Sequence, residues 1–429
     1  MFNAESLEII IRERRHDGFV RPDYGRFSLA EVPTTLAAIL GSSSDRPTLP
    51  AELWHKHAGV RRVLCLLVDG FGLDQFLDYR ALLPTLQRIE HAGDVHALTS
   101  VFPSTTPAAL TTMHTGLTPQ EHGLPEWTVF FEEIDEIIET LPFRVLLTPG
   151  RDTLLEAGGH PEMLYDGSTI YEHLARAGVE SSVFVFHEYA HSVYSRATQK
   201  GAHVTPYVNV LDLMQKLVEH LEIQRGPGYD FVYWGAIDSA LHQFGPGSRE
   251  HIAALRLFFE EASKELFERL SKAAAKDVLL VVLADHGHAK VDPSRVVYLN
   301  RYLELERYYS RRKSQDAIVP TGGPNDVFLF IDPARIPDTL RLLAERLGDR
   351  AVVLETADAL QQGLFGLGVP TPQFRRRIGD VLILPRAGNH VWYEHRPNSP
   401  FEQLGCHGGL TDTEMLVPLA MCPLEALVG

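Results

Sequence analysis

Four short runs of β-branched and aliphatic residues limit the folds open to this chain more than any other feature. They cover residues 63–68, 183–186, 231–237 and 278–284. Apolar runs of this length are typical of strands that are buried on both faces. Between them, residues 170–177, 210–221 and 252–270 place apolar side chains at helical spacing. This alternation predicts an α/β fold with a mainly parallel sheet covered by helices on both faces.

An aspartate stands one residue beyond three of the four runs, at Asp69, Asp238 and Asp285. In parallel sheets, ligands collect at the carboxyl ends of the strands, where neighbouring strand ends lie side by side. The three carboxylates are therefore expected at one edge of the sheet, facing a common site.

A strand, helix, strand pattern covers residues 327–355, and a Gly- and Pro-rich stretch at 320–324 precedes it. We therefore expect a small inserted α/β cap at residues 318–380. The remainder is then an N-terminal extension packed on the core, followed by two parts of the catalytic core, with bounds 1–60, 61–317 and 381–429.

The composition restricts the partners. Hydrophobic residues make up 45% of the chain and charged residues 22%, as in a folded globular protein. The formal net charge of −16 argues against a nucleic-acid polymer, whose phosphates need clustered Lys and Arg. Three widely separated cysteines argue against a disulfide framework. No stretch reads as a signal sequence or a membrane span, so we expect a cytoplasmic protein that does not bind membranes.

Two motifs each allow a structural and a functional interpretation. Asp69 ends an apolar run and is followed by Gly70, which permits a sharp turn; the pair is either a surface turn or a metal site. Thr106 precedes Pro107, an arrangement typical of a helix N-cap followed by its first residue. Thr106 is then either only a cap or a hydroxyl beside an anion site made by the helix N-terminus.

Three further motifs supply nitrogen and oxygen donors. Asp238 and His242 are four residues apart and would share one helical face. Asp285 and His286 are adjacent at a strand end, where burial of both would be costly without a partner such as a metal. His407 is followed by two glycines that permit close approach. These donors suit two divalent ions, zinc first and manganese as the alternative.

Taken together, the motifs resemble those of the nucleotide pyrophosphatase/phosphodiesterase family of the alkaline phosphatase superfamily, over roughly residues 62–418. The resemblance implies an alkaline-phosphatase-like fold. It also implies that Thr106 is the nucleophile, because family members place this hydroxyl nine residues before a Thr-Gly pair, here Thr115 and Gly116; Thr105 does not have that spacing.

The resemblance also implies a ligand set and a reaction. Asp69, Asp285 and His286 would bind one ion together with Thr106, and a second ion would be bound by Asp238, His242 and His407. The expected reaction is hydrolysis of a small-molecule phosphate ester through a phosphothreonine intermediate, with one ion activating Thr106 and the other a water. We expect further support from four residues, either around the ligands or in the substrate pocket: Thr105, Trp127, His288 and Asp412.

The substrate is less constrained than the chemistry. Nucleotide diesterases of the family usually carry Phe-Pro-Asn directly after the nucleophile and an asparagine some twenty residues later. Here residues 107–109 are Pro-Ala-Ala, and Trp127 takes the later position. A phosphomonoesterase or a phosphonate hydrolase of the same superfamily therefore remains an alternative.

Two alternatives belong to other classes. Residues 187–191 read His-Glu-Tyr-Ala-His, the H-E-x-x-H pattern of zinc peptidases, although the motif follows an apolar run and is expected in a loop instead of a helix. The other alternative is a binding protein that keeps the fold without catalysis, although all seven expected ligand and nucleophile positions are filled.

Overall fold

A seven-stranded sheet forms the centre of the computed structural model, which describes residues 2–429. Its strands, in order across the sheet, are β4 (Asp94–Thr99), β20 (Leu416–Pro423), β11 (Val278–Leu283), β3 (Arg62–Val68), β10 (Gly228–Trp234), β8 (Glu180–Phe186) and β9 (His203–Tyr207). The strands from β11 to β9 are parallel, and β20 runs antiparallel to both of its neighbours. The prediction of a mainly parallel sheet is confirmed.

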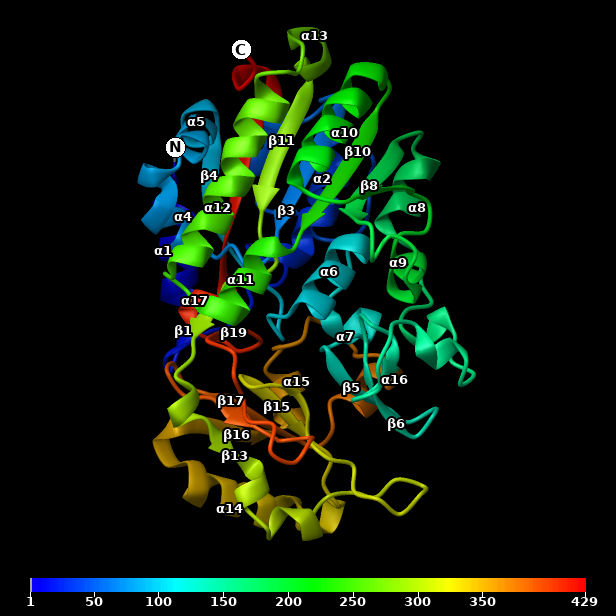
Figure 1. Cartoon of the computed structure of the whole chain (residues 1–429), viewed down its shortest axis with the longest axis vertical. Helices are drawn as coiled ribbons and strands as arrows, with labels where there is room; N and C mark the ends of the chain where they lie inside the picture. Colours follow the sequence, from blue (N-terminus) through cyan, green and yellow to red (C-terminus); the bar gives the residue numbers. More distant parts are fainter. Residues whose placement is uncertain (1) are drawn as a thin grey trace.

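Helices cover both faces of this sheet, as the sequence predicts. Helices α10 (Val210–Ile223) and α12 (Arg249–Glu261) lie in front of it in Figure 1, and α2 (Val32–Ile39) lies behind it. The other main-layer helices are α1 (Ala4–Arg14), α3 (Ala51–Trp54), α4 (Leu73–Tyr79), α5 (Pro84–Ala92), α6 (Thr106–Thr115), α8 (Ile170–Arg176), α11 (Ala236–Phe244), α13 (Lys272–Ala275) and α17 (Asp412–Met415). The central strands β3 and β11 are buried along their whole length because helices cover both faces of the sheet there, whereas β9 at the edge is partly exposed.

The first 60 residues contribute to the same core. Ile10, Leu29 and Leu36 are buried within the main hydrophobic cluster, together with the strands of the central sheet. Residues Leu29–Glu31 form a short 3₁₀ turn that leads into α2.

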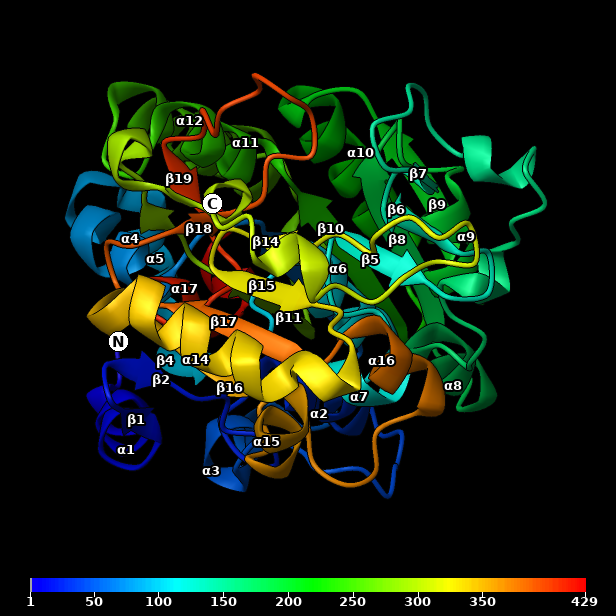
Figure 2. The ribbon, with the colours of Figure 1, turned by 90° about the horizontal axis from the view of Figure 1, so that it is seen from below.

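A second, antiparallel sheet lies beyond the carboxyl ends of the central strands, at the bottom of Figure 1. Its strands, in order, are β14 (Thr321–Gly323), β15 (Asp326–Leu329), β17 (Val381–Pro385) and β16 (Ala351–Glu355). Helix α14 (Ile336–Leu347) lies across this small sheet in the end-on view of Figure 2. Leu343 and Leu347 pack with the strands in a separate hydrophobic cluster. The expected strand, helix, strand unit is present, and β17 extends the sheet just past residue 380.

Shorter elements lie outside the two sheets and their main helices. They are α7 (Pro119–His122), α9 (Val193–Thr198), α15 (Thr356–Gln361), α16 (Pro372–Arg377), and the strands β1 (Arg15–His16), β2 (Phe19–Val20), β5 (Thr128–Phe131), β6 (Glu136–Glu139), β7 (Arg144–Val145), β12 (Ala289–Lys290), β13 (Val297–Tyr298), β18 (Val391–Trp392) and β19 (Gly405–Cys406). All three cysteines are free and buried, in agreement with the expected lack of disulfides. Within residues 2–429, no helix combines the length and apolar character needed to cross a bilayer.

A buried ion pair joins β3 and β10 near the ends of the strands that lie away from the small sheet. The Arg62 guanidinium donates to both carboxylate oxygens of Asp230 at 2.8 Å, and His220 Nε2 lies 2.8 Å from the same carboxylate. The side chains of Arg62 and Asp230 are 1% and 0% exposed. Removal of one partner of such a pair destabilises the fold, because the remaining charge is then buried without compensation.

We expect Asp230→Ala to lower the free energy of unfolding by about 3–5 kcal/mol, measured by urea denaturation. Joint replacement of Arg62 and Asp230 by Met and Leu should recover much of this loss, since it leaves no buried charge. A loss below about 1 kcal/mol in the single variant would contradict this account.

Candidate metal centre

The central strands end level with one another and so bring their following residues together. Val68 pairs with Trp234 across β3 and β10, and Leu283 pairs with Leu67 across β11 and β3. Asp69 follows β3 directly, and Asp285 comes two residues after β11. Both carboxylates therefore lie at the edge of the sheet that faces the small sheet.

Gly70 is needed for this arrangement. Its φ of +73° is a left-handed conformation that favours glycine, and its N–H donates to Asp285 Oδ1 at 3.1 Å. A Cβ at this position would lie 3.1 Å from the His288 ring. The sharp turn expected after Asp69 is confirmed.

Asp238 reaches the same place by another route than the sequence suggested. The apolar run 231–237 does not form one strand: β10 ends at Trp234, and α11 begins at Ala236 after Gly235 as N-cap. The prediction that Asp238 directly follows a strand is wrong. Asp238 lies in the first turn of α11, and His242 follows one turn later on the same face, as their spacing predicts.

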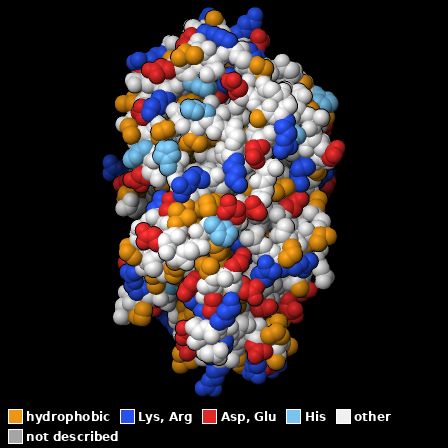
Figure 3. Space-filling model, turned by 90° about the vertical axis from the view of Figure 1, so that its right-hand side faces the viewer, with side chains coloured by type: hydrophobic (Ala, Val, Ile, Leu, Met, Phe, Trp, Pro, Cys, Tyr) orange, Lys and Arg blue, Asp and Glu red, His pale blue; other side chains and the backbone are white. Residues whose placement is uncertain are grey.

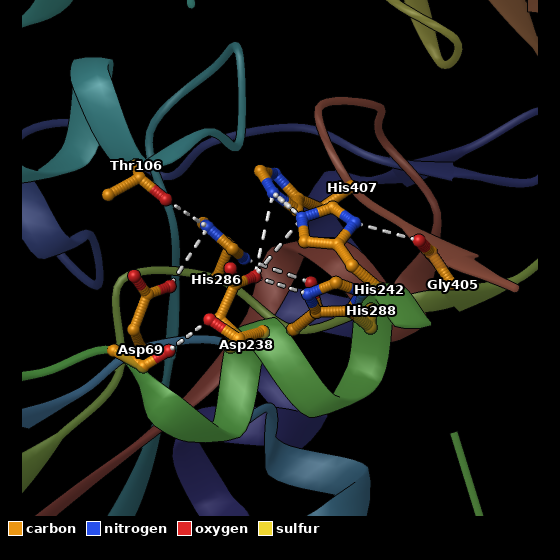
Figure 4. Close-up of polar contacts among 12 residues, drawn as sticks. Asp69, Thr106, Asp238, His242, His286, His288, Gly405 and His407 are labelled. Atoms are coloured by element: carbon orange, nitrogen blue, oxygen red, sulfur yellow. Dashed lines mark hydrogen bonds and ion pairs between the residues drawn. The ribbon is translucent and has the colours of Figure 1, made fainter. Parts of the chain in front are cut away.

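The first donor group consists of Asp69, Asp285 and His286, whose ligand atoms lie within 4.8 Å of one another. His286 Nε2 is 3.5 Å from Asp69 Oδ1, 3.3 Å from Asp285 Oδ2 and 3.2 Å from Thr106 Oγ1. All four side chains are buried. Figure 4 shows Thr106 and Asp69 converging on His286 from different segments.

The second donor group gathers around Asp238 Oδ1. His288 Nε2 lies 2.7 Å from this oxygen, His242 Nε2 3.4 Å and His407 Nε2 3.7 Å. The rings of His286 and His407 stack with centroids 3.7 Å apart, so the two donor groups are contiguous. The same three-dimensional grouping is visible in Figure 4.

Backbone carbonyls orient three of the imidazoles. The Nδ1 atoms of His242, His286 and His407 lie 2.9, 3.1 and 3.0 Å from the carbonyl oxygens of Gly405, Gly287 and Ser104. If each Nδ1–H donates to its carbonyl, each Nε2 carries its lone pair toward the centre. The Nε2 atoms of His242 and His407 are only 3.2 Å apart. Two facing lone pairs repel each other unless a cation or a proton lies between them.

The electrostatics of the carboxylates also indicate that this site needs a cation. Burial, then the neighbouring carboxylates of Asp285 and Asp238, raises the pKa of Asp69 well above its usual value. Among residues 2–429, Asp69 Oδ1 and Asp285 Oδ2 are buried atoms without a hydrogen-bond partner. Buried carboxylate oxygens normally have partners, and a cation would supply them here. The mixed oxygen and nitrogen donors fit zinc or manganese.

Thr106 occupies a different helical position from the one expected. The N-cap of α6 is Thr105, in extended conformation, and Thr106 is the first helical residue. The N-cap prediction for Thr106 is therefore wrong by one residue. Its hydroxyl is not used in capping, which leaves Oγ1 free to face His286, while the positive end of the helix dipole adjoins it.

The remaining predicted positions differ in their surroundings. Thr105 Oγ1 donates to the Pro125 carbonyl at 3.4 Å. Asp412 does not reach the centre: its carboxylate pairs with Arg15 at 3.0 Å near the surface.

Gly408, next to His407, has a φ of +116°, and a Cβ there would lie 2.4 Å from Asp326 Oδ1. The close approach expected of this glycine is confirmed.

Tyr233 is a site residue that the sequence did not reveal. Its hydroxyl donates a short hydrogen bond to Asp69 Oδ2, and its ring lies at the end of β10. Within an apolar run, a tyrosine reads as one more strand residue. Its place next to the strand end was the only available signal.

The two histidines of the H-E-x-x-H motif belong to neither donor group. Residues 187–191 form a turn after β8, and His187 and His191 are exposed. In the described part of the chain, neither histidine belongs to a cluster of three potential ligands. The peptidase alternative therefore has no structural support.

Two cavities meet at the donor groups. The first, of about 530 Å³, includes Asp69 and several aromatic side chains, and the second, of about 1000 Å³, includes His242 and His407. Thr106, Trp127 and Asp238 line both. Trp127, which is 40% exposed, is therefore a wall common to two compartments that share Thr106 and Asp238.

His288 is expected to act by positioning Asp238. It is buried, and its Nε2 lies 2.7 Å from Asp238 Oδ1. We expect His288→Ala to weaken metal binding and kcat/KM by roughly 10- to 100-fold, measured by metal titration and steady-state kinetics. His288→Gln, which can still donate to Asp238, should recover part of both. Equal losses in the two variants with unchanged metal affinity would show a purely structural role.

Comparisons with known proteins agree with this geometry. The family model described as type I phosphodiesterase / nucleotide pyrophosphatase matches residues 63–410. A venom phosphodiesterase of Macrovipera lebetinus is 25% identical over 271 residues, which are 61% of this chain and 30% of that protein. The rat ectonucleotide pyrophosphatase/phosphodiesterase family member 3 is 24% identical over 278 residues, 62% of this chain and 29% of that protein. This chain thus matches about 30% of the length of such relatives.

A shorter relative and a solved structure match a larger share of this chain. An uncharacterized pyrophosphatase/phosphodiesterase of Schizosaccharomyces pombe is 26% identical over 365 residues, 81% of this chain and 67% of that protein. Murine ectonucleotide pyrophosphatase/phosphodiesterase 5, solved as an inactive threonine-to-alanine variant with AMP, superposes with a TM-score of 0.62. It is 19% identical, over 84% of this chain and 87% of that one.

Proposed function

This chain belongs to the type I phosphodiesterase / nucleotide pyrophosphatase family, and from that premise we propose that it hydrolyses phosphate esters with Thr106 as nucleophile. Its fold is alkaline-phosphatase-like, with a central mixed sheet flanked by helices. The single observation that carries the proposal is the convergence of Thr106 Oγ1 with the two donor groups at one strand edge.

The donor groups fit two divalent cations. Asp69, Asp285 and His286 would hold one, with Thr106 beside it, and Asp238, His242 and His407 would hold the other. When bound, such cations supply positive charge that makes a hydroxyl or a water more nucleophilic and offsets charge on the transferring phosphoryl group.

The chain's own residues carry the covalent steps. Thr106 gives up its hydroxyl proton to solvent and its Oγ attacks phosphorus, so that an Oγ–P bond forms while the bond from phosphorus to the leaving oxygen breaks. The leaving oxygen departs with the electron pair of that bond and takes up a proton from solvent. Water then attacks the phosphothreonine, releasing phosphate or its monoester and returning the proton to Thr106. Tyr233 holds Asp69 in place through its hydroxyl, and the N-terminus of α6 favours negative charge beside Thr106.

The substrate class proposed is a small phosphate diester or pyrophosphate, with a nucleotide as the first candidate. The AMP complex of the murine relative supports a nucleotide, and the aromatic side chains of the first cavity suit a flat ring. Phosphomonoesters and phosphonates remain second candidates, because Pro107 and Trp127 replace residues typical of nucleotide diesterases.

The test is a comparison of kcat/KM on bis-nitrophenyl phosphate, nitrophenyl phosphate and the nitrophenyl ester of AMP, with zinc or manganese added. We expect the two diesters to be hydrolysed faster than the monoester. Preference for the monoester would favour a phosphatase, and hydrolysis of none would favour a binding protein that keeps the fold.

A further inference from the structure

The second cavity is larger than a small phosphate ester requires. Its volume of about 1000 Å³ lies at the upper end of the range for small-molecule sites, roughly 300–1,000 Å³. It is bounded by the central core, by the β14–β15 turn of the small sheet and by the segment that follows β18. None of the steps proposed for Thr106 uses these outer walls.

The in-line geometry of phosphoryl transfer indicates which part of the substrate enters the second cavity. In phosphoryl transfer, the attacking and leaving oxygens lie roughly in line on opposite sides of phosphorus. Thr106 Oγ1 lies beside the first donor group, 3.2 Å from His286 Nε2. The leaving oxygen is then directed toward the second donor group, whose Asp238, His242 and His407 all line the second cavity.

The first cavity lies where the other substituent on phosphorus, the group that is retained, would bind. Asp69 lines it and does not line the second cavity, and its walls include Tyr189 and Trp234. It can therefore hold the group that stays on phosphorus, and Trp127 contributes to the walls of both cavities.

The walls of the second cavity indicate the chemistry of the leaving group. Trp392 lies against Phe401, with ring centroids 5.2 Å apart, and both line the cavity. Arg396 also lines it, is exposed, and has no ion pair with another residue in 2–429. Arg144 is already paired with Glu139. A flat apolar surface and a guanidinium without an ion pair, both on the walls of one cavity, suit a ring-bearing group that carries negative charge.

We propose that the second cavity is a leaving-group subsite for a ring-bearing, anionic leaving group of nucleotide size, bound by Trp392 and Arg396. The inference rests on the proposed function, since it extends the same reaction. In each turnover, the bond from phosphorus to the leaving oxygen breaks as the bond to Thr106 forms, and the released group departs through the second cavity.

The experiment compares two substrates that share the retained AMP group: its nitrophenyl ester and diadenosine pyrophosphate, whose leaving group is a second AMP. Trp392→Ala is expected to lower kcat/KM for the pyrophosphate by about tenfold or more, while the nitrophenyl ester changes less than about threefold. Arg396→Ala, at an exposed position that folding does not require, should act in the same direction by up to about tenfold.

Tyr189→Ala in the first cavity is the matched control, and it should lower both rates by the same factor because the retained group is the same. Equal effects of Trp392→Ala and Arg396→Ala on the two substrates would overturn the subsite. Wild-type protein that hydrolyses neither substrate nor bis-nitrophenyl phosphate would instead overturn the proposed function, so the two failures are distinguishable.

Discussion

Thr106→Ala is expected to lower kcat by at least about 10⁴-fold on bis-nitrophenyl phosphate, because no other hydroxyl or thiol replaces the nucleophile. Thr106 Oγ1 contacts His286 Nε2 at 3.2 Å and is not engaged in helix capping. Removing it should cost about 1 kcal/mol of stability or less, since one hydrogen bond is lost. Steady-state kinetics, thermal unfolding and metal content of the same preparation separate the loss of chemistry from loss of fold.

Two neighbouring substitutions make this test selective. Thr106→Ser keeps a hydroxyl at the same position and should keep much of the activity. Thr105→Ala tests the assignment by spacing: if Thr105 were the nucleophile, this variant and not Thr106→Ala would be inactive. Recovery of the phosphoryl group on any residue other than Thr106 after rapid quenching would also contradict the proposal.

The strands β3, β8, β10 and β11 of the central sheet could be predicted because they are mostly buried and therefore read as apolar runs, whereas no such run was recognised for β4, β9 and β20. The same rule failed at residues 231–237, where Ile237 is as apolar as the strand but belongs to α11. Gly235, the N-cap of that helix, was the local signal of the break. Helix and strand cannot be distinguished by hydrophobicity alone over so few residues.

The resemblance brought the distant ligand segments together, but the sequence could not specify which individual side chains meet. His288 meets Asp238 from 50 residues away, and β17 pairs with β15 across more than one intervening helix. Neither contact leaves a periodic pattern in the chain. Asp412, close to His407 in sequence, was wrongly expected near the site, because the chain turns into α17 and directs the carboxylate to Arg15.

The second large expected effect concerns metal content and activity. We expect each of the two donor groups to hold one cation. Wild-type protein should contain two equivalents of zinc or manganese, measured by elemental analysis against protein concentration. Asp285→Asn in the first donor group and Asp238→Asn in the second should each lose one equivalent and lower kcat/KM by roughly 10³-fold or more. The loss should be large in both cases, because each carboxylate supplies negative charge that balances the cation held between it and the neighbouring imidazoles.

The matched control is His191→Ala, which removes the second histidine of the H-E-x-x-H motif from an exposed turn. It should retain both equivalents and full activity, since the motif lies outside every cluster of potential ligands in residues 2–429. The facing Nε2 atoms of His242 and His407, 3.2 Å apart, favour a second equivalent, because without it one ring must carry a proton between them, either as a charged imidazolium or by giving up its Nδ1–H bond to a backbone carbonyl. Burial and the adjacent imidazoles hold the pKa of His407 well below its usual value, which disfavours the charged form of that ring. Fully active protein with one equivalent or none would therefore contradict the two-cation arrangement.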